Sequence, residues 1–295
     1  MANNTNTDIP MPTPTTPRLP LNRYKLLSFD VYGTLIQYKQ HILTSFQPLL
    51  TRLPPISPHR NTTPLNPSLA NCATQGDISF LQLFQRQEDK IKLELAAKPM
   101  RFDAVLGELW RRIAHTLDVF TTEDEAAAFG SEANIASWPA FDGTLDALRA
   151  LQSDDAPGYR LVALSNVDRF ATDMTFAATG LDGVAWAKVF TAEDFGTAAE
   201  DLRLADQRKF EALLRFAGET GVEKGEILHV AQSLGHDHKP AKDVGVASVF
   251  LVGDGPVWGK EGESRMAVEN GLVGYGWRCK DLREFAGIVE REVKS

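Results

Sequence analysis

The sequence predicts an α/β protein with a Rossmann-like three-layer core, a parallel sheet and an inserted helical cap domain. Three observations predict this fold. Short apolar runs recur along the chain, helical patterns alternate with them, and one long helical stretch interrupts the alternation. Strands that alternate with helices favour a parallel sheet covered on both faces. Runs that are apolar at successive positions are typical of strands in such sheets.

The predicted strands end in polar residues. The first ends at Asp30, the second at Ser165 and Asn166, and the third at Gln232 and Ser233. Ligand sites of parallel sheets lie beyond the carboxyl ends of the strands. We therefore expect these side chains to meet at one edge of the sheet. The four apolar runs are residues 25–30, 160–166, 227–233 and 247–252.

A helical insertion separates the first predicted strand from the rest. Residues 81–95 and 102–117 have helical patterns with no apolar strand between them. We assign residues 41–137 to this cap, and residues 23–40 and 138–295 to the core domain. Within the cap, residues 48–71 are expected to form a surface loop, since their proline density disfavours a helix or a central strand.

The amino terminus and the overall charge narrow the class of protein. Residues 1–22 are polar and lack the apolar segment of a secretory signal, so we expect a disordered leader. The net charge of −8 argues against a nucleic-acid partner. No segment is long and apolar enough to span a membrane. Two cysteines give no disulfide framework and suit a reducing, cytoplasmic compartment.

Three motifs carry a family resemblance. They are Phe29–Leu35, Leu164–Asn166 and the segment from His229 to Asp237. In this order and spacing they resemble the haloacid dehalogenase superfamily. The chain is most similar to its type II, (S)-2-haloacid dehalogenase-like branch, and to fungal members of it in particular. The resemblance covers roughly residues 24–290, apart from the leader and the proline-rich loop, and it implies a hydrolase.

In this family Asp30 would be the nucleophile. A carboxylate held at a strand end among hydrogen-bond donors, with water restricted, attacks carbon better than it does in bulk water. The resemblance implies that Asp30 displaces halide and forms an ester, which water then hydrolyses. Phosphatase relatives carry a second aspartate two residues later, which protonates the leaving alcohol. Tyr32 stands there instead, and halide needs no such proton.

Further site residues follow from the same resemblance. Thr34 is expected to hold Asp30, and Ser165 and Asn166 to bind a substrate carboxylate or phosphate. Asp237 would position the hydrolytic water. Arg86, on a cap helix, resembles the arginine that receives halide or clamps the substrate. Tyr32 is counted with the substrate-binding residues, and Gln232 and Ser233 as supporting residues.

No obligate cofactor is expected, although Mg²⁺ is possible. If Mg²⁺ is used, Asp30 and Asp237 would bind it. Gln232 replaces an acid that is usual in phosphatases, which weakens a site for a cation that prefers hard oxygen ligands. His236 and His238 flank Asp237 without a supporting Cys or Glu cluster, so structural or rim roles are expected.

The family's lysine is missing from its usual place. Residues 204–207 read Leu-Ala-Asp-Gln where a lysine would follow the third strand. Two close carboxylates without a cation would raise one pKa and weaken the nucleophile. The replacement could be Lys188, Arg203, Arg208 or Lys209, or the site could be degenerate. Arginine is an imperfect substitute, because its planar fork differs from a compact ammonium.

The sequence leaves three functions open. The first is a 2-haloacid dehalogenase or a related small-molecule hydrolase of a metabolite pathway, including secondary metabolism. The second is a Mg²⁺-dependent small-molecule phosphatase. The third is a non-catalytic binding protein on a degenerate fold. The expected partner is a small-molecule substrate that the sequence does not identify, and a homodimer is possible.

Overall fold

The structure is a computed structural model of the 295-residue chain. It describes residues 9–64, 73–95, 100–153, 156–195, 202–253 and 261–294. Within these ranges, the side chains of residues 202–205 and 261–263 are not described.

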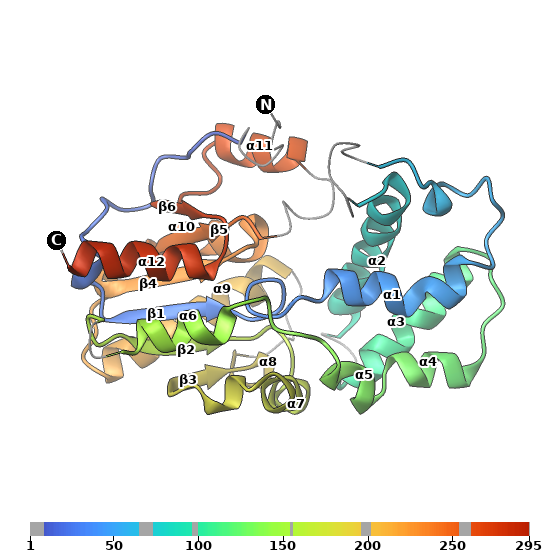
Figure 1. The fold of residues 1–295 in the computed structure, drawn as a ribbon, viewed down its shortest axis with the longest axis horizontal. Helices are drawn as coiled ribbons and strands as arrows, with labels where there is room; N and C mark the ends of the chain where they lie inside the picture. Colours follow the sequence, from blue (N-terminus) through green and yellow to red (C-terminus); the bar gives the residue numbers. More distant parts are fainter. Residues whose placement is uncertain are drawn as a thin grey trace.

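A parallel sheet forms the centre of the core domain (Figure 1). Within the described residues it has six strands in the order β3-β2-β1-β4-β5-β6. All five residues of β1 are buried, because β2 and β4 flank this strand and helices cover both faces. The strands are β1 (Leu26–Asp30), β2 (Arg160–Leu164), β3 (Trp186–Phe190), β4 (Ile227–Ala231), β5 (Ala247–Leu251) and β6 (Trp277–Cys279).

Helices lie on both faces of the sheet, so the predicted three-layer fold is confirmed (Figure 1). Leu26 of β1 packs with the helices of one face and Leu27 with those of the other, as alternation along a strand requires. The first face holds α9 (Leu202–Glu219) and α10 (Lys239–Val244); the second holds α6 (Thr144–Leu151) and α12 (Leu282–Val293). The remaining core helices are α7 (Arg169–Thr179), α8 (Ala192–Phe195) and α11 (Glu261–Glu269). No described helix combines the length and hydropathy needed to cross a membrane.

A helical body, which we call the cap, lies beyond the carboxyl ends of the strands (Figure 1). Its centre is aromatic: the buried ring of Phe46 lies 4.6 Å from that of Trp110 and 4.7 Å from that of Phe129. Such ring pairs add to the free energy gained by burying apolar area. The cap helices are α1 (Lys39–Leu50), α2 (Gln75–Glu94), α3 (Phe102–Thr116), α4 (Glu123–Phe129) and α5 (Glu132–Ala136).

The prediction of a surface loop over residues 48–71 is wrong at its start. Pro48 lies inside α1, and the helix continues to Leu50. Proline in the last turn removes little helical hydrogen bonding, and the burial of Leu49 and Leu50 offsets that loss. A short 3₁₀ turn follows at Pro58–Arg60. Residues 65–72 lie outside the described part of the chain.

The prediction of a disordered leader is wrong for residues 9–22, which pack along the β5–β6 edge of the core. Ile9 is only 4% exposed and joins a small apolar cluster with Phe250 and Tyr275. Covering an edge strand also removes a surface open to unwanted pairing. The polar composition of the segment concealed Ile9 as an apolar anchor; residues 1–8 are not described. Further contacts are Thr15 Oγ1 to the Gly274 carbonyl (3.0 Å), Arg278 to the Pro10 carbonyl (2.9 Å), and Arg18 over the Trp277 ring (4.6 Å).

Replacing Ile9 with alanine should therefore lower the free energy of unfolding by about 2 kcal/mol, because a buried side chain is truncated in a packed cluster. Urea unfolding would measure the change. Met11→Ala is the matched control, since Met11 is 50% exposed two residues further on. Equal effects of the two substitutions would contradict the packing of this segment.

Candidate active site

The strand ends and the cap enclose a cavity of about 610 Å³. Asp30 ends β1, Asn166 follows β2, and Gln232 and Asp237 follow β4; all four line this cavity. The convergence expected at the sheet edge is therefore observed. The opposite wall comes from the cap helices α2 and α3, through residues such as Phe84.

Thr34 holds the carboxylate of Asp30. Its Oγ1 donates to Asp30 Oδ2 over 2.7 Å and accepts the N–H of Gln232 over 3.1 Å, so one hydroxyl joins the loops after β1 and β4. The first loop is tight because the carbonyl of Val31 accepts the N–H of Leu35 (2.8 Å) and of two neighbours. Gly33 has a φ of 96°, a backbone conformation that favours glycine.

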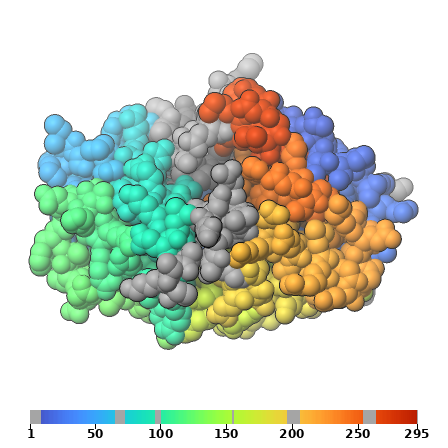
Figure 2. Space-filling model, turned by 180° about the vertical axis from the view of Figure 1, so that it is seen from behind, coloured from blue at the N-terminus to red at the C-terminus, as the bar shows by residue number. Residues whose placement is uncertain are grey.

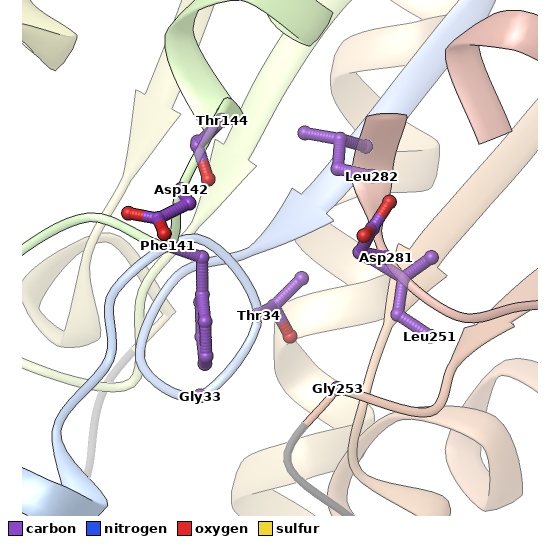
Figure 3. Close-up of a pocket in the computed structure, with 9 residues that line it drawn as sticks. All are labelled: Gly33, Thr34, Phe141, Asp142, Thr144, Leu251, Gly253, Asp281 and Leu282. Carbon is purple, nitrogen blue, oxygen red and sulfur yellow. The ribbon is translucent and has the colours of Figure 1, made fainter. Parts of the chain in front are cut away.

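A much smaller hollow, of about 20 Å³, lies against the same loop and is lined by Gly33, Thr34 and residues of three other segments (Figure 3). Figure 3 shows Thr34 between Phe141 on one side and Leu251 and Asp281 on the other. This volume holds about one water molecule. The larger cavity is therefore the candidate substrate site.

Lys209 supplies the cation that the motif lacked. Its Nζ lies 2.6 Å from Asp237 Oδ1, and both side chains are almost completely buried. Lys209 lies within α9, on the face that also buries Phe210 and Leu213, whereas the family position falls near residue 204. The ammonium therefore enters the site from further along the helix. The sequence signal for this role was the position of Lys209 on the apolar face of a predicted helix.

Two of the other three candidates, Arg208 and Lys188, do not take this place. Arg208 is exposed on α9. Lys188 lies on β3 with its Nζ 5.4 Å from the centre of the Phe190 ring. The side chain of Arg203 lies outside the described part of the structure.

His229 is a second support of Asp237 that the sequence analysis did not single out. Its Nε2 lies 3.3 Å from Asp237 Oδ1 and its Nδ1 lies 2.9 Å from Ser28 Oγ. Burial lowers the pKa of His229, which favours the neutral ring despite the nearby carboxylate. Ser28 and His229 are register partners on β1 and β4, so two polar residues facing each other across apolar strands were the available signal.

The two carboxylates have opposite electrostatic environments. Burial and then the neighbouring Asp237 raise the pKa of Asp30 to about 7, and Lys209 and Thr34 oppose this only in part. Burial would also raise the pKa of Asp237, but Lys209 and His229 hold it below its ordinary value. Burial lowers the pKa of Lys209, but three carboxylates outweigh it and keep the ammonium charged. Two carboxyl groups whose pKa values are shifted in opposite directions are typical of sites where the two acids have different catalytic roles.

The remaining predicted residues take several positions. Tyr32 lines the cavity, and its hydroxyl lies 2.9 Å from Thr175 Oγ1. Ser165 is buried, with its hydroxyl 3.0 Å from Thr172 Oγ1, so it stabilises the turn and leaves the lining to Asn166. Ser233 lines the cavity and accepts the N–H of His236 over 3.1 Å.

The expected position of Arg86 is wrong. Arg86 lies on α2 as predicted, but its side chain is exposed and lies outside the cavity lining. The reason is helical phase: Gln85, Glu88 and Lys92 occupy the face of α2 that turns toward the cavity. His238 is buried, with Nδ1 2.8 Å from Ser248 Oγ, in the structural role expected of it.

The donor set does not suit Mg²⁺. Oδ1 of Asp237 already faces Lys209 and His229, and Gln232 provides an amide where an acid is usual. In the described part of the chain, no group of three or more His, Cys, Asp or Glu side chains is arranged to hold a metal ion. Mg²⁺ prefers several hard oxygen ligands, and a lysine ammonium at the same oxygen opposes a cation.

Comparisons with known proteins agree with this fold. A family model described as haloacid dehalogenase-like hydrolase matches residues 24–245. The L-2-haloacid dehalogenase of Xanthobacter autotrophicus is 15% identical, with a TM-score of 0.62 over 90% of this chain and 98% of that chain. A defluorinating L-2-haloacid dehalogenase is 15% identical, with a TM-score of 0.59 over 95% and 99%. A magnesium-bound HAD-hydrolase, YfnB of Bacillus subtilis, is 14% identical, with a TM-score of 0.58 over 90% and 99%. No curated protein matches the sequence.

The opposite environments predict opposite effects of two isosteric substitutions. The folded pKa of Asp30 lies above its ordinary value of 3.8, so its ionisation costs stability as the pH rises from about 4 to 7. Asp30→Asn should therefore stabilise the protein by about 2 kcal/mol at pH 8 and by much less at pH 4.5.

Asp237→Asn is the matched control. Its carboxylate has a lowered pKa and stabilises the fold above about pH 4, so its loss should destabilise the protein by nearly the same amount at pH 8 and at pH 4.5. Urea unfolding of both variants at the two pH values would measure this. Destabilisation by Asp30→Asn at pH 8 would contradict the raised pKa of Asp30 in the folded protein.

Proposed function

The chain belongs to the haloacid dehalogenase-like hydrolase family, and from this premise we propose that it cleaves a bond at carbon through an ester on Asp30. The observation that carries the proposal is the carboxylate pair of Asp30 and Asp237 with the buried ammonium of Lys209. Thr34 fixes one oxygen of Asp30, and Lys209 pairs with Asp237 and attracts Asp30. A cation at this point keeps part of Asp30 ionised at neutral pH, as a nucleophile requires.

The first half of the reaction is a displacement. A carboxylate oxygen of Asp30 forms a bond to the substrate carbon, and the carbon–halogen bond breaks with its electron pair going to halide. Thr34 holds the rotamer of Asp30, which reduces the entropy lost on reaching the transition state. Halide leaves as an anion without a proton, so Tyr32 can stand where phosphatases carry an acid.

The second half is hydrolysis of the ester. Water attacks the ester carbonyl carbon of Asp30, the bond between this carbon and the substrate oxygen breaks, and Asp30 is regenerated. Asp237 positions the water, while Lys209 and His229 hold Asp237. The net reaction converts an organic halide and water into an alcohol, a halide ion and a proton.

The two other functions open to the sequence have less support. The phosphatase needs a metal site that Gln232 and the ammonium on Asp237 disfavour, and an acid where Tyr32 stands. The non-catalytic alternative relied on a missing cation, which Lys209 supplies. The fungal type, the cytoplasmic location and a role in a metabolite pathway remain predictions.

Halide release from a panel of α-halo acids and α-halo amides, without added metal, tests the proposal. The wild type should release halide from at least one member, and Asp30→Asn should reduce release to the background rate, because the nucleophile is lost. A single turnover in H₂¹⁸O, with enzyme in excess, should place the label in the Asp30 carboxylate.

No release from any panel member by folded protein would refute carbon–halogen cleavage. Phosphate release that requires Mg²⁺, measured in parallel on small phosphate esters, would favour the phosphatase instead. Label in the product but none in Asp30 would refute the ester.

The rate should also follow the ionisation of Asp30. With a pKa of about 7, kcat/KM should fall about tenfold per pH unit below that value and level off above it. Lys209→Met should move the inflection to higher pH and lower kcat/KM about a hundredfold, because the remaining carboxylates repel. Arg208→Met is the control, because Arg208 is exposed and adjacent to Lys209; it should change neither the inflection pH nor kcat/KM. An inflection that stays in place in Lys209→Met would contradict the role of the ammonium.

A further inference from the structure

The cavity is larger than a small haloacid substrate requires. Its volume of about 610 Å³ lies within the range of pockets that enclose drug-sized ligands, about 300–1,000 Å³. A two- or three-carbon haloacid would fill a small part of it and would leave most of the apolar wall in water. Apolar wall area left uncovered contributes nothing to affinity.

Much of the wall is aromatic. Trp138 packs edge-on against Tyr32, with ring centres 5.6 Å apart, and stacks on Tyr38 at 6.1 Å. Phe102 of α3 approaches Trp138 at 6.1 Å. All four residues line the cavity, and Phe84 of α2 lines it as well. A rigid aromatic wall binds an apolar or aromatic body at low cost in side-chain entropy.

The cations of the cap wall are already paired with carboxylates of the chain itself. Lys92 Nζ lies 3.1 Å from Glu88 Oε2 on the same helix. Arg101 Nε donates to Asp103 Oδ1 over 2.9 Å, and its guanidinium lies 4.0 Å above the Phe170 ring. A substrate carboxylate would have to compete with these intramolecular partners.

The core wall repeats this arrangement. His236 Nδ1 lies 2.8 Å from Asp206 Oδ2, and Lys209 is held by Asp237. The described lining includes three basic residues, Lys92, Arg101 and His236, and six acidic residues, Asp30, Glu88, Asp168, Glu193, Asp206 and Asp237. An anion that enters a partly enclosed cavity of this charge is repelled and loses hydration.

Two polar groups of the lining lack a hydrogen-bond partner among the described residues, the acceptor Oε1 of Gln85 and the donor Nε1 of Trp138. Both atoms are buried. A buried donor or acceptor left unpaired costs free energy that a partner can recover. An amide group of a substrate can donate to Gln85 and accept from Trp138, whereas a carboxylate can only accept.

On the basis of the proposed function, we infer that the substrate is a largely apolar molecule of drug-like size that is neutral or cationic. Its body occupies the aromatic wall, a donor group faces α2, and its reactive carbon lies at Asp30. The charge pattern of this cavity disfavours a short free carboxylic acid. The inference concerns the substrate class and leaves the chemistry of Asp30 unchanged.

Halide release from five α-bromo compounds tests this inference. They are 2-bromopropanoate, 2-bromopropanamide, and three N-phenylalkyl-2-bromopropanamides whose rings bear no charge, a carboxylate or an aminomethyl group. The three large amides share one reacting centre and one size, so only charge separates them. We expect kcat/KM for the neutral and cationic large amides to exceed that of the large carboxylate, and of both short compounds, by about tenfold or more.

A charge substitution on the cap should change the preference. Glu88→Gln removes the ion pair of Lys92 with Glu88, so kcat/KM for the large carboxylate should rise about fivefold, the effect of one unit charge near 4 Å in a hydrated cavity. The rate for the neutral amide should change much less, because this compound carries no charge for Lys92 to attract. Glu94→Gln is the matched control, because Glu94 also lies on α2, pairs with Arg112 at 2.6 Å and lies outside the lining.

The outcomes separate the two proposals. Release from 2-bromopropanoate that equals or exceeds release from the large neutral amide would overturn the inferred substrate class and leave the Asp30 chemistry intact. Equal rates for the three large amides would overturn the charge preference, as would the same response to Glu88→Gln and Glu94→Gln. No release from any compound contradicts the proposed function itself.

Discussion

The buried ion pair between Lys209 and Asp237 is the interaction on which the site depends. Three parts of the core meet in it: α9 supplies the ammonium, the segment after β4 supplies the carboxylate, and His229 of β4 supports the same oxygen. Removing one partner would leave a buried charge, which costs far more than the pair itself contributes. The pair therefore fixes Asp237 beside Asp30 and sets the field in which Asp30 ionises. Because one ammonium serves two carboxylates, one of them keeps a raised pKa, and here that residue is Asp30.

Sequence reasoning located the parts of the site that depend on the backbone. Polar residues at the carboxyl ends of parallel strands must share an edge, so the meeting of Asp30, Asn166 and Gln232 followed from strand order alone. The strand at Trp186–Phe190 escaped prediction because Lys188 and partial exposure interrupt its apolar pattern. The three-residue edge strand β6 was too short to give a pattern.

Side-chain direction was harder to predict, since it depends on helical phase. Arg86 and Lys92 lie six residues apart on one helix, and only the second turns toward the cavity. A shift of one residue in the assumed phase moves a side chain by about 100°, enough to exchange a wall position for solvent. Lys209 shows the same effect in reverse: its distance from the motif position hid it, and its place in the apolar face of α9 brings it into the site.

The residues proposed for the chemistry lie in the core, whereas much of the wall that would select the substrate lies in the cap. Asp168 joins the two parts. Asp168, in the loop after β2, caps α7 by accepting the N–H of Ala171 over 2.9 Å, and it accepts the N–H of Phe102 over 2.6 Å. This second bond ties the first residue of α3, in the cap, to the core beside Asn166. The core supplies Asp30, Lys209 and Asp237, the proposed nucleophile, cation and water-positioning acid, while α2 and α3 supply much of the apolar wall. Changes in the cap can therefore alter the substrate without disturbing the ion pair, provided that the bond from Phe102 to Asp168 keeps the wall in place.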